Sequence, residues 1–315
     1  MKKKILIIGF GNIGFRHVES ILSKKYLIYI VDPKKNYFDK ISKTKKKCEI
    51  KYFNNIKKID IKNFDLLISA TSSDVRYITT VNAIRRFNIK NIIFEKVVFT
   101  KKSQFFDIKK ILEKNKIKSW VNCPLRNMEV FKNIKKSYKK KDKLIIKVKG
   151  TNWNMASNTI HYLDLFNFFD KGKFNSFENK LKKQIYHSKR SSFFELYGTI
   201  KFIKNKKKYL MVEDYENSKQ LRIIIEFNSY LFILKIGKKS NNLISYFKDK
   251  LIKRSSFIIH NQSSMTSKVV SKILQKKNPG LISFSESLNL HMIFLDIIDN
   301  HLINNLKTIR NYPVT

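Results

Sequence analysis

Short apolar segments alternate with helix-like periodicity along the first part of the chain. Apolar runs predict buried strands at residues 4–9, 26–31, 66–70, 91–95 and 119–123. Between these runs, apolar positions three and four residues apart predict two helices, one carrying Ile13, Val18, Ile21 and Leu22 and the other carrying Val75, Ile78, Val81 and Ile84. Strands that alternate with helices are typical of a parallel sheet built from βαβ units.

The hydrophobic pattern changes after residue 122. Residues 144–149 alternate, residues 155–169 form an apolar helix, and a last amphipathic helix covers about 285–302. Several alternating strands lie between residues 193 and 236, and this alternation is typical of a mostly antiparallel sheet with one covered face. We therefore predict an α/β chain: a doubly wound parallel-sheet (Rossmann) domain at 1–122 and an α+β domain with a mostly antiparallel open sheet at 123–315.

The charge balance is extreme but dispersed. The 315 residues include 66 Lys+Arg and 24 Asp+Glu, a net charge of +42. Lysine greatly outnumbers arginine and occurs in short runs along the whole chain, whereas base-reading proteins concentrate arginine. We interpret the lysines as a solvated background and predict no specific nucleic-acid partner; a functional polyanion surface is the alternative.

Other sequence features favour a cytoplasmic protein. Cys48 and Cys123 show no CxxC spacing, which favours a reducing compartment. The basic, apolar amino terminus superficially resembles a signal peptide, but its apolar stretch is short and is followed by Arg16 and His17 without a cleavage site. No apolar window approaches the ~18 residues of a membrane span, and the histidines show no metal-ligand clustering, so we predict neither membrane association nor a metal.

The positions of the glycines are informative about function. The chain has only eight, and three of them, Gly9, Gly11 and Gly14, form GxGxxG directly after a predicted strand and at the opening of a helix. The first permits a tight turn, the second lets the backbone approach a pyrophosphate, and the third allows close helix packing. Asp32 closes the second strand, where a carboxylate hydrogen-bonds the ribose 2′-hydroxyl of NAD and repels the 2′-phosphate of NADP.

We therefore predict an NAD site, with NADP as an open alternative and a ligand-free glycine turn as the other interpretation. The residues after the later strands complete the predicted pocket. The full set is Gly9, Gly11, Asn12, Ile13, Gly14, Asp32, Ala70, Thr71, Ser72, Glu95 and Lys96.

Four segments in this order resemble the glucose-fructose oxidoreductase and inositol dehydrogenase family, often called Gfo/Idh/MocA. They are GFGNIGFRH (9–17), ISATSSDVR (68–76), FEKV (94–97) and the helix with His161, and SFSESLNLH (283–291) extends the likeness. The stretch NWNMASNTIHYLDLF (152–166) and the ending NYPVT (311–315) are similar to members associated with bacterial surface-glycan sugar pathways. The resemblance implies hydride transfer between nicotinamide and a sugar or nucleotide-sugar hydroxyl or ketone.

The same resemblance assigns candidate catalytic residues. Lys96 would be the catalytic lysine, although the family's Glu-Lys-Pro is Glu95-Lys96-Val97 here and lacks the proline that gives a rigid bend. The family's Asp-x-x-x-His is Ser157-x-x-x-His161. His161 can still move a proton near neutral pH, whereas Ser157 can hydrogen-bond but supplies no negative charge.

Further residues near this motif are predicted to contact substrate. Arg126 suits a substrate phosphate or carboxylate, or it bridges the domains; Ser157, Asn158 and His161 complete the predicted substrate set, and Asp164 lies close by. Arg76 stands where relatives often carry histidine. The changes at Val97 and Ser157 motivate an alternative, a dinucleotide-binding sensor or assembly protein without catalysis. We also expect a homo-oligomer formed through the carboxy-terminal sheet.

Overall fold

The computed structural model describes residues 2–23, 25–34, 41, 48–184, 186–188, 193–215, 220–237, 239–260 and 262–305. The NYPVT segment therefore lies outside the described residues. The chain divides into two compact units, here called the first unit (1–124 and 260–287) and the second unit (125–259 and 288–315). The first boundary lies close to the expected one, but residues 260–287 return to the first unit, which the sequence pattern did not indicate.

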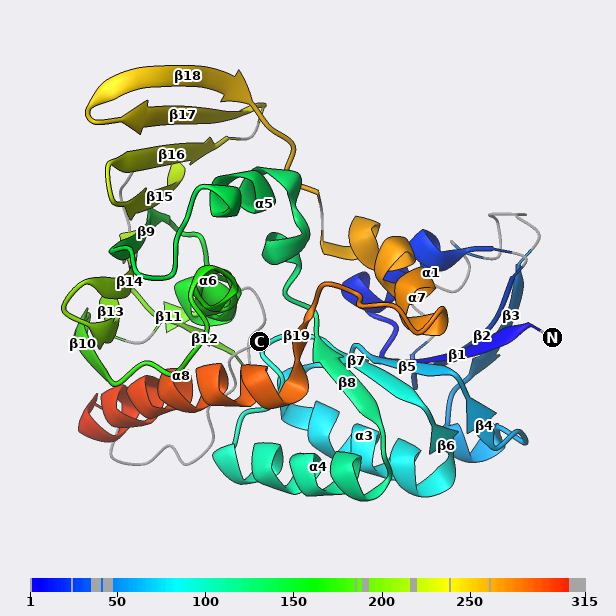
Figure 1. Cartoon of the computed structure of the whole chain (residues 1–315). Coiled ribbons are helices and arrows are strands. Elements are labelled where there is room, and N and C mark those ends of the chain that lie inside the picture. Colours follow the sequence, from blue (N-terminus) through cyan, green and yellow to red (C-terminus); the bar gives the residue numbers. More distant parts are fainter. Residues whose placement is uncertain are drawn as a thin grey trace. The chain divides into compact units, whose positions relative to one another are not determined.

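The first unit contains a seven-stranded sheet in the order β19-β8-β7-β5-β1-β2-β3 (Figure 1). Six strands are parallel, and β19 pairs antiparallel with β8 at one edge. The strands are β1 (Lys3–Ile8), β2 (Tyr26–Val31), β3 (Glu49–Phe53), β5 (Leu66–Ser69), β7 (Asn91–Phe94), β8 (Lys118–Val121) and β19 (Ile282–Ser283). The strand order reverses between β1 and β5, where open α/β sheets bind ligands at the carboxyl ends of their strands.

Helices cover both faces of this sheet. In Figure 1, α1 (Asn12–Ile21) and α7 (Thr266–Leu274) lie on one face and α3 (Ser73–Arg86) and α4 (Lys102–Lys114) on the other. The short elements η1 (Ile56–Lys58), β4 (Asn63–Phe64), β6 (Asn88–Ile89) and η3 (Gln262–Met265) complete the unit. The predicted Rossmann sheet is thus confirmed.

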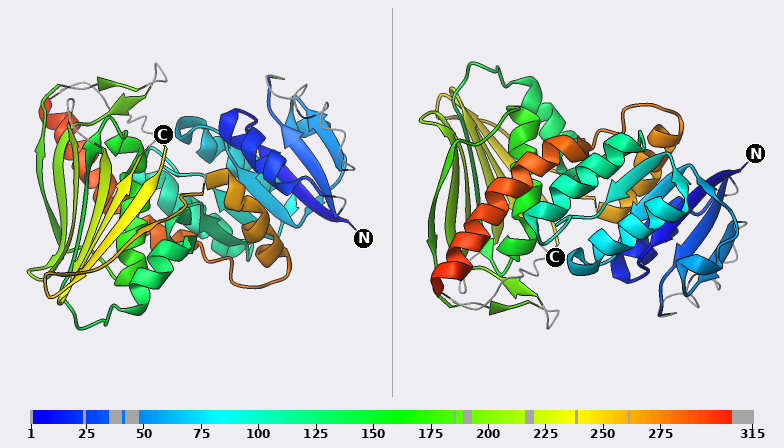
Figure 2. Two further views of the ribbon diagram at one scale, coloured as in Figure 1. Left: turned by 90° about the horizontal axis from the view of Figure 1, so that it is seen from above. Right: turned by 90° about the horizontal axis from the view of Figure 1, so that it is seen from below.

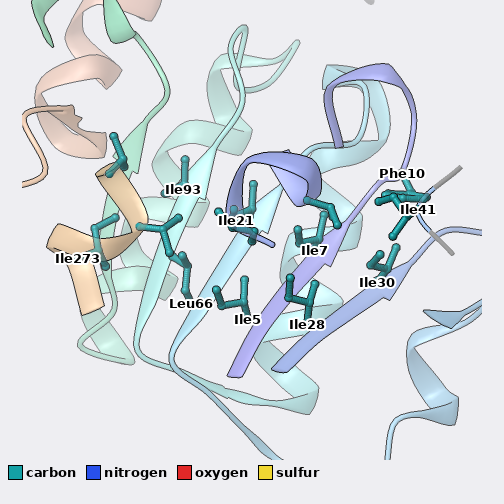
Figure 3. Close-up of a cluster of buried hydrophobic side chains, with 14 of the residues drawn as sticks. Ile5, Ile7, Phe10, Ile21, Ile28, Ile30, Ile41, Leu66, Ile93 and Ile273 are labelled. Carbon is teal, nitrogen blue, oxygen red and sulfur yellow. The ribbon is translucent and has the colours of Figure 1, made fainter. Parts of the chain in front are cut away.

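One apolar cluster joins the early and the returning segments of the first unit. Ile5 and Ile28 of the central strands pack with Ile21 of α1 and Ile273 of α7 (Figure 3). These side chains are almost completely buried, and the burial of each one stabilises the folded state by roughly 1.5–3 kcal/mol. The returning segment is therefore part of the core of the first unit.

Helix α3 differs from its prediction. The expected apolar face included Val75 and Ile78, but these side chains are 42% and 51% exposed. The buried face contains Val81 and Ile84 as expected. It also contains polar residues, among them Arg76 and Thr80, whose hydroxyl lies 3.0 Å from that of Ser69 on β5. Hydrogen bonds to neighbouring loops and strands make burial of these polar groups favourable, and apolar periodicity cannot reveal such bonds.

The second unit contains an eight-stranded sheet in the order β10-β13-β14-β9-β15-β16-β17-β18. It is antiparallel except where β14 pairs parallel with β9, so the predicted mostly antiparallel sheet is confirmed. The strands are β9 (Leu144–Thr151), β10 (Ser176–Leu181), β13 (Gly198–Asn205), β14 (Lys208–Tyr215), β15 (Leu221–Phe227), β16 (Tyr230–Ile236), β17 (Asn241–Phe247) and β18 (Lys250–Ser256).

Helices of the second unit lie against one side of this curved layer (Figure 2). Alternate residues of β15, such as Ile223 and Ile225, are buried on the covered side. The other elements are η2 (Pro124–Asn127), which begins in the first unit, α5 (Glu129–Lys136), α6 (Met155–Phe169), the pair β11 (Tyr186–His187) and β12 (Phe194–Glu195), and α8 (Phe284–Asn305), which also begins in the first unit. Helix α6 has the bounds that the sequence predicted. Among the described helices, none combines the length and apolar character needed to cross a membrane.

Candidate functional site

The glycine loop connects β1 to α1 at the point where the strand order reverses. Gly9 has φ +93°, and a Cβ there would lie 2.5 Å from the backbone nitrogen of Thr71. A Cβ on Gly14 would lie 2.0 Å from the carbonyl oxygen of Gly9. These two glycines are therefore required by the close packing of the loop against the end of β5 and the start of α1.

Gly11 has a different reason to be glycine. A Cβ on Gly11 would meet nothing within 4 Å, and its φ of −75° is open to any residue. Gly11 is also the N-cap of α1. Because it has no side chain, no capping side chain covers the N–H groups at the start of the helix. Protein packing does not explain this glycine, whereas close approach of a pyrophosphate to the N–H groups of the helix start does.

Asp32 lies beside this loop at the end of β2. Its Oδ2 accepts the Phe10 N–H at 2.6 Å and its Oδ1 accepts the Lys34 N–H at 2.8 Å. Its carbonyl oxygen accepts the Tyr52 hydroxyl. The carboxylate is thus fixed next to the glycine loop, as expected for a group that meets the ribose of a dinucleotide. The loop and Asp32 fit such a cofactor.

The other predicted cofactor residues follow β5 and β7. The Ala70 N–H donates to Ile8 of β1 at 2.8 Å, and Ser72 is the N-cap of α3. Lys96 is the second residue after β7 and is partly exposed, and its peptide bond to Val97 is cis. Because the carboxyl ends of parallel strands meet at one edge of a sheet, these segments share an edge with the glycine loop. Asn12 and Ile13 open α1 at this edge.

Glu95, next to Lys96, is held in a buried polar network. Its Oε1 lies 2.8 Å from His17 Nε2 and accepts the Asn122 amide at 2.6 Å, while His17 Nδ1 lies 2.7 Å from the Thr266 hydroxyl. Burial alone would raise the pKa of Glu95. The hydrogen bond and charge of His17, followed by the Asn122 hydrogen bond and the Arg76 charge, outweigh burial and lower this pKa to about 2. Glu95 is therefore an ionised structural group, and it connects α1, β8 and the returning segment.

In the second unit, Ser157 and His161 lie one turn apart on α6. Ser157 is buried, and its hydroxyl donates to Oε1 of Glu195 on β12; Oε2 of Glu195 accepts the Ala156 N–H at 2.9 Å. His161 is partly exposed. A carboxylate therefore contacts the first turn of α6, although none stands at residue 157 itself. The sequence pattern missed Glu195 because its partner is 38 residues away.

A second buried carboxylate, Asp214 of β14, lies at the same end of α6. Its Oδ2 accepts the Trp153 N–H at 3.1 Å, and its side chain is 1% exposed. Burial is the largest cause that raises the pKa of Asp214 to about 7; backbone N–H groups oppose burial, and Glu195 adds to it. Burial, together with Asp214, also raises the pKa of Tyr162. Asp214 thus titrates near neutral pH, and no sequence signal identified it.

Arg126 is paired within the second unit. Its Nε donates to Asp164 Oδ2 at 3.0 Å and its Nη2 to Asp164 Oδ1 at 2.6 Å, and both residues are buried. This bidentate pair joins η2 to α6. Asn158, another predicted substrate residue, donates its amide to the Trp153 carbonyl at 2.8 Å and closes the loop before α6.

The structure thus gathers the predicted residues into two groups. Those predicted to bind the cofactor lie in the first unit, together with Lys96; Arg126, Ser157, Asn158 and His161 lie in the second. Among the residues that the structure describes, no group of three or more His, Cys, Asp or Glu side chains is arranged to hold a metal ion.

Comparisons with known proteins agree with the geometry of the first unit. Residues 1–90 match the family model NAD_binding_7, whose description reads "Putative NAD(P)-binding". No curated protein matches the sequence.

Solved structures match the fold of nearly the whole chain at low sequence identity. UDP-N-acetylglucosamine 3-dehydrogenase GnnA from Acidithiobacillus ferrooxidans has a TM-score of 0.71 at 9% identity, over 94% of this chain and 97% of that one. Biliverdin reductase from Synechocystis sp. PCC 6803, in complex with biliverdin and NADP+, has 0.71 at 10% identity, over 95% and 97%. A super-repressor mutant of Gal80p from Saccharomyces cerevisiae has 0.73 at 13% identity, over 96% and 97%.

These likenesses show a shared fold, and the family match concerns the residues that form the glycine loop and Asp32. The chain therefore shares its fold with NAD(P)-dependent oxidoreductases, and its residues 1–90 match an NAD(P)-binding family model.

Proposed function

We propose that the chain is an NAD(P)-dependent oxidoreductase that transfers hydride between the nicotinamide and a hydroxyl or ketone carbon of a sugar or nucleotide sugar. The observation that carries this proposal is the position of Lys96, two residues after the end of β7, on the sheet edge that also holds the glycine loop. The fold shared with a UDP-N-acetylglucosamine dehydrogenase supports the substrate class. A role in surface-polysaccharide synthesis follows from the sequence resemblance.

The proposed chemistry needs a group that moves a proton. The bound cofactor supplies the acceptor or donor of hydride. When a secondary alcohol is oxidised, its carbon loses a hydride and its oxygen loses a proton, so a ketone forms. We assign the proton to Lys96, a partly exposed titratable side chain at the position that the family resemblance implies. The same resemblance implies a proton-transfer role for His161, which is also partly exposed.

Glu195 supports the role of His161. A negative charge near a histidine favours its protonated form. The sequence lacks a carboxylate at residue 157. The hydrogen bond between the Ser157 hydroxyl and Glu195 of β12 places a carboxylate at the same end of α6. The serine therefore does not remove negative charge from this region.

The test combines a binding measurement with a matched pair of lysine variants. The full chain is screened against nucleotide sugars with NAD+ and NADP+ while cofactor absorbance is followed. Lys96→Met is expected to lower turnover at least 100-fold and to keep the thermal shift with cofactor. The shift reflects a stabilisation of the folded state of about 2.7 kcal/mol when the cofactor concentration is 100 times its Kd. Lys101→Met is the control, because Lys101 is exposed at the start of α4 and makes no capping hydrogen bond.

Unchanged turnover in Lys96→Met would remove this residue from the mechanism. Cofactor binding without turnover of any sugar would favour the second candidate function, a dinucleotide-binding sensor or assembly protein. The observation that favours this second function is the equally good match of the fold to Gal80p, whose structure was solved as a super-repressor mutant.

A further inference from the structure

Arg76 is the largest side chain in the described residues that is almost completely buried, at 2% exposure. It lies on the inner face of α3, one turn after the helix start. Arginine keeps its charge in proteins, so burying it is unfavourable unless its N–H groups are hydrogen-bonded. The acceptors that Arg76 contacts therefore indicate why it is there.

The guanidinium of Arg76 bonds to main-chain carbonyls of two loops. Its Nη1 donates to the carbonyl of Glu95 at 2.7 Å, to that of Val98 at 2.9 Å and to that of Val97. Its Nη2 donates to the carbonyl of Thr71. One planar group thus ties the loop after β5 to the loop after β7.

The acceptors of Arg76 lie on both sides of Lys96. The carbonyl of Glu95, the residue before Lys96, and the carbonyl of Val97, the residue after it, both accept from Nη1. A rigid fork of donors fixes the orientation of these peptide groups better than a flexible ammonium can. The direction in which the Lys96 side chain leaves the backbone is therefore set by Arg76.

We propose that Arg76 is a positioning residue for Lys96, which it aims by holding the main chain before and after that lysine and by joining it to the Thr71 loop. This inference rests on the proposed function of Lys96, whereas the contacts of Arg76 are independent of that function. Arg76 acts through the main chain and has no role in proton transfer itself.

The chain offers a matched control on the same helix. Arg86 of α3 also donates to two main-chain carbonyls, those of Lys57 at 2.6 Å and Ile59 at 3.0 Å, but these belong to the η1 region. Arg76→Gln and Arg86→Gln therefore remove the same chemical group from one helix, and only the first removes contacts around Lys96. Arg76→Lys keeps the charge without the fork and provides a milder variant if the glutamine variant folds poorly.

The first measurement is hydrogen exchange of the full chain, read by mass spectrometry, and it is independent of any activity. Arg76→Gln, or Arg76→Lys, is expected to speed exchange in peptides that cover residues 95–98 and 71–72 by at least tenfold, with peptides from β1 and β2 unchanged. Arg86→Gln leaves residues 95–98 as in the wild type. Equal acceleration throughout the first unit, or none at residues 95–98, overturns the proposal.

The second measurement separates turnover from binding. Misplacing a reacting group by about 1 Å costs on the order of 100-fold in rate. We expect kcat of Arg76→Gln to fall about 100-fold with the cofactor Kd changed less than threefold, and added guanidinium chloride at millimolar concentration to restore part of kcat. A wild-type rate in Arg76→Gln overturns the proposal. If the wild type turns over no sugar, the proposed function fails, and the exchange result alone decides the positioning role.

Discussion

At the scale of single residues, the three glycines of the loop have separable roles. A methyl group fits at Gly11 without contact, whereas at Gly14 it collides with the carbonyl oxygen of Gly9. We expect Gly14→Ala to lower the free energy of unfolding by about 3 kcal/mol, as overpacking does. Gly11→Ala is expected to leave that free energy nearly unchanged and to weaken NAD(H) affinity at least tenfold, because the methyl group occupies the approach of the pyrophosphate.

Urea denaturation and calorimetric titration measure the two effects on the glycine variants. Each variant serves as the control for the other. Full cofactor affinity in Gly11→Ala would mean that the ligand does not approach the backbone at this position.

Asp214 makes stability depend on pH. The pKa of its carboxyl is raised to about 7 in the folded protein, while in the unfolded chain it is near the ordinary aspartate value of 3.8. Between these values the folded state binds more protons than the unfolded state, so the free energy of unfolding falls as pH rises from about 4 to 7. Asp214→Asn keeps an acceptor for the Trp153 N–H and is expected to reduce this fall by on the order of 2 kcal/mol.

The measurement is a series of denaturant curves from pH 4 to pH 8 on wild type and Asp214→Asn. Asp60→Asn, which changes an exposed carboxylate, is the control and should follow the wild type. Parallel curves for wild type and Asp214→Asn would show that Asp214 does not titrate in this range.

At the scale of elements, α6 is fixed by charged groups at two places. The Glu195 carboxylate binds N–H groups of its first turn, and the Arg126–Asp164 pair binds its middle to η2. We expect Arg126→Met to lower the free energy of unfolding by about 3–5 kcal/mol, because it leaves the buried Asp164 carboxylate without its cation.

The double variant Arg126→Met with Asp164→Leu is the control for Arg126, since it removes both charges and should recover much of the loss. Urea denaturation of the wild type, Arg126→Met, Asp164→Leu and the double variant gives the coupling between the two residues. A substrate KM that rises in Arg126→Met with unchanged stability would instead support the substrate contact predicted from the sequence.

At the scale of the whole molecule, the sequence predicted those parts of the fold whose pattern is local. Apolar runs and the glycine spacing identified β1, α1 and β2, and the period of the apolar residues gave the bounds of α6. The return of residues 260–287 to the first unit was missed, because periodicity shows that a helix is amphipathic but not what it packs against.

The candidate site was predictable to the same extent. Gly11, Asp32 and Lys96 follow strands in the order of a known motif, so their places on the sheet edge could be inferred. Arg76 and Glu195 could not be assigned contacts in advance, because the Glu95 carbonyl is 19 residues from Arg76 and Ser157 is 38 residues from Glu195, and each pair meets only in the folded chain. Buried polar side chains break the apolar pattern that sequence analysis relies on.

The returning segment has a consequence for how the protein is made. Val270 and Ile273 of α7 cover Val18 and Ile21 of α1, and β19 closes one edge of the sheet. Chains leave the ribosome amino terminus first, and domains generally fold as units as they emerge. The residues of α7 and β19 are synthesised after all eight strands of the second sheet, so the sheet of the first unit and its covering helices can be completed only after those strands have been made.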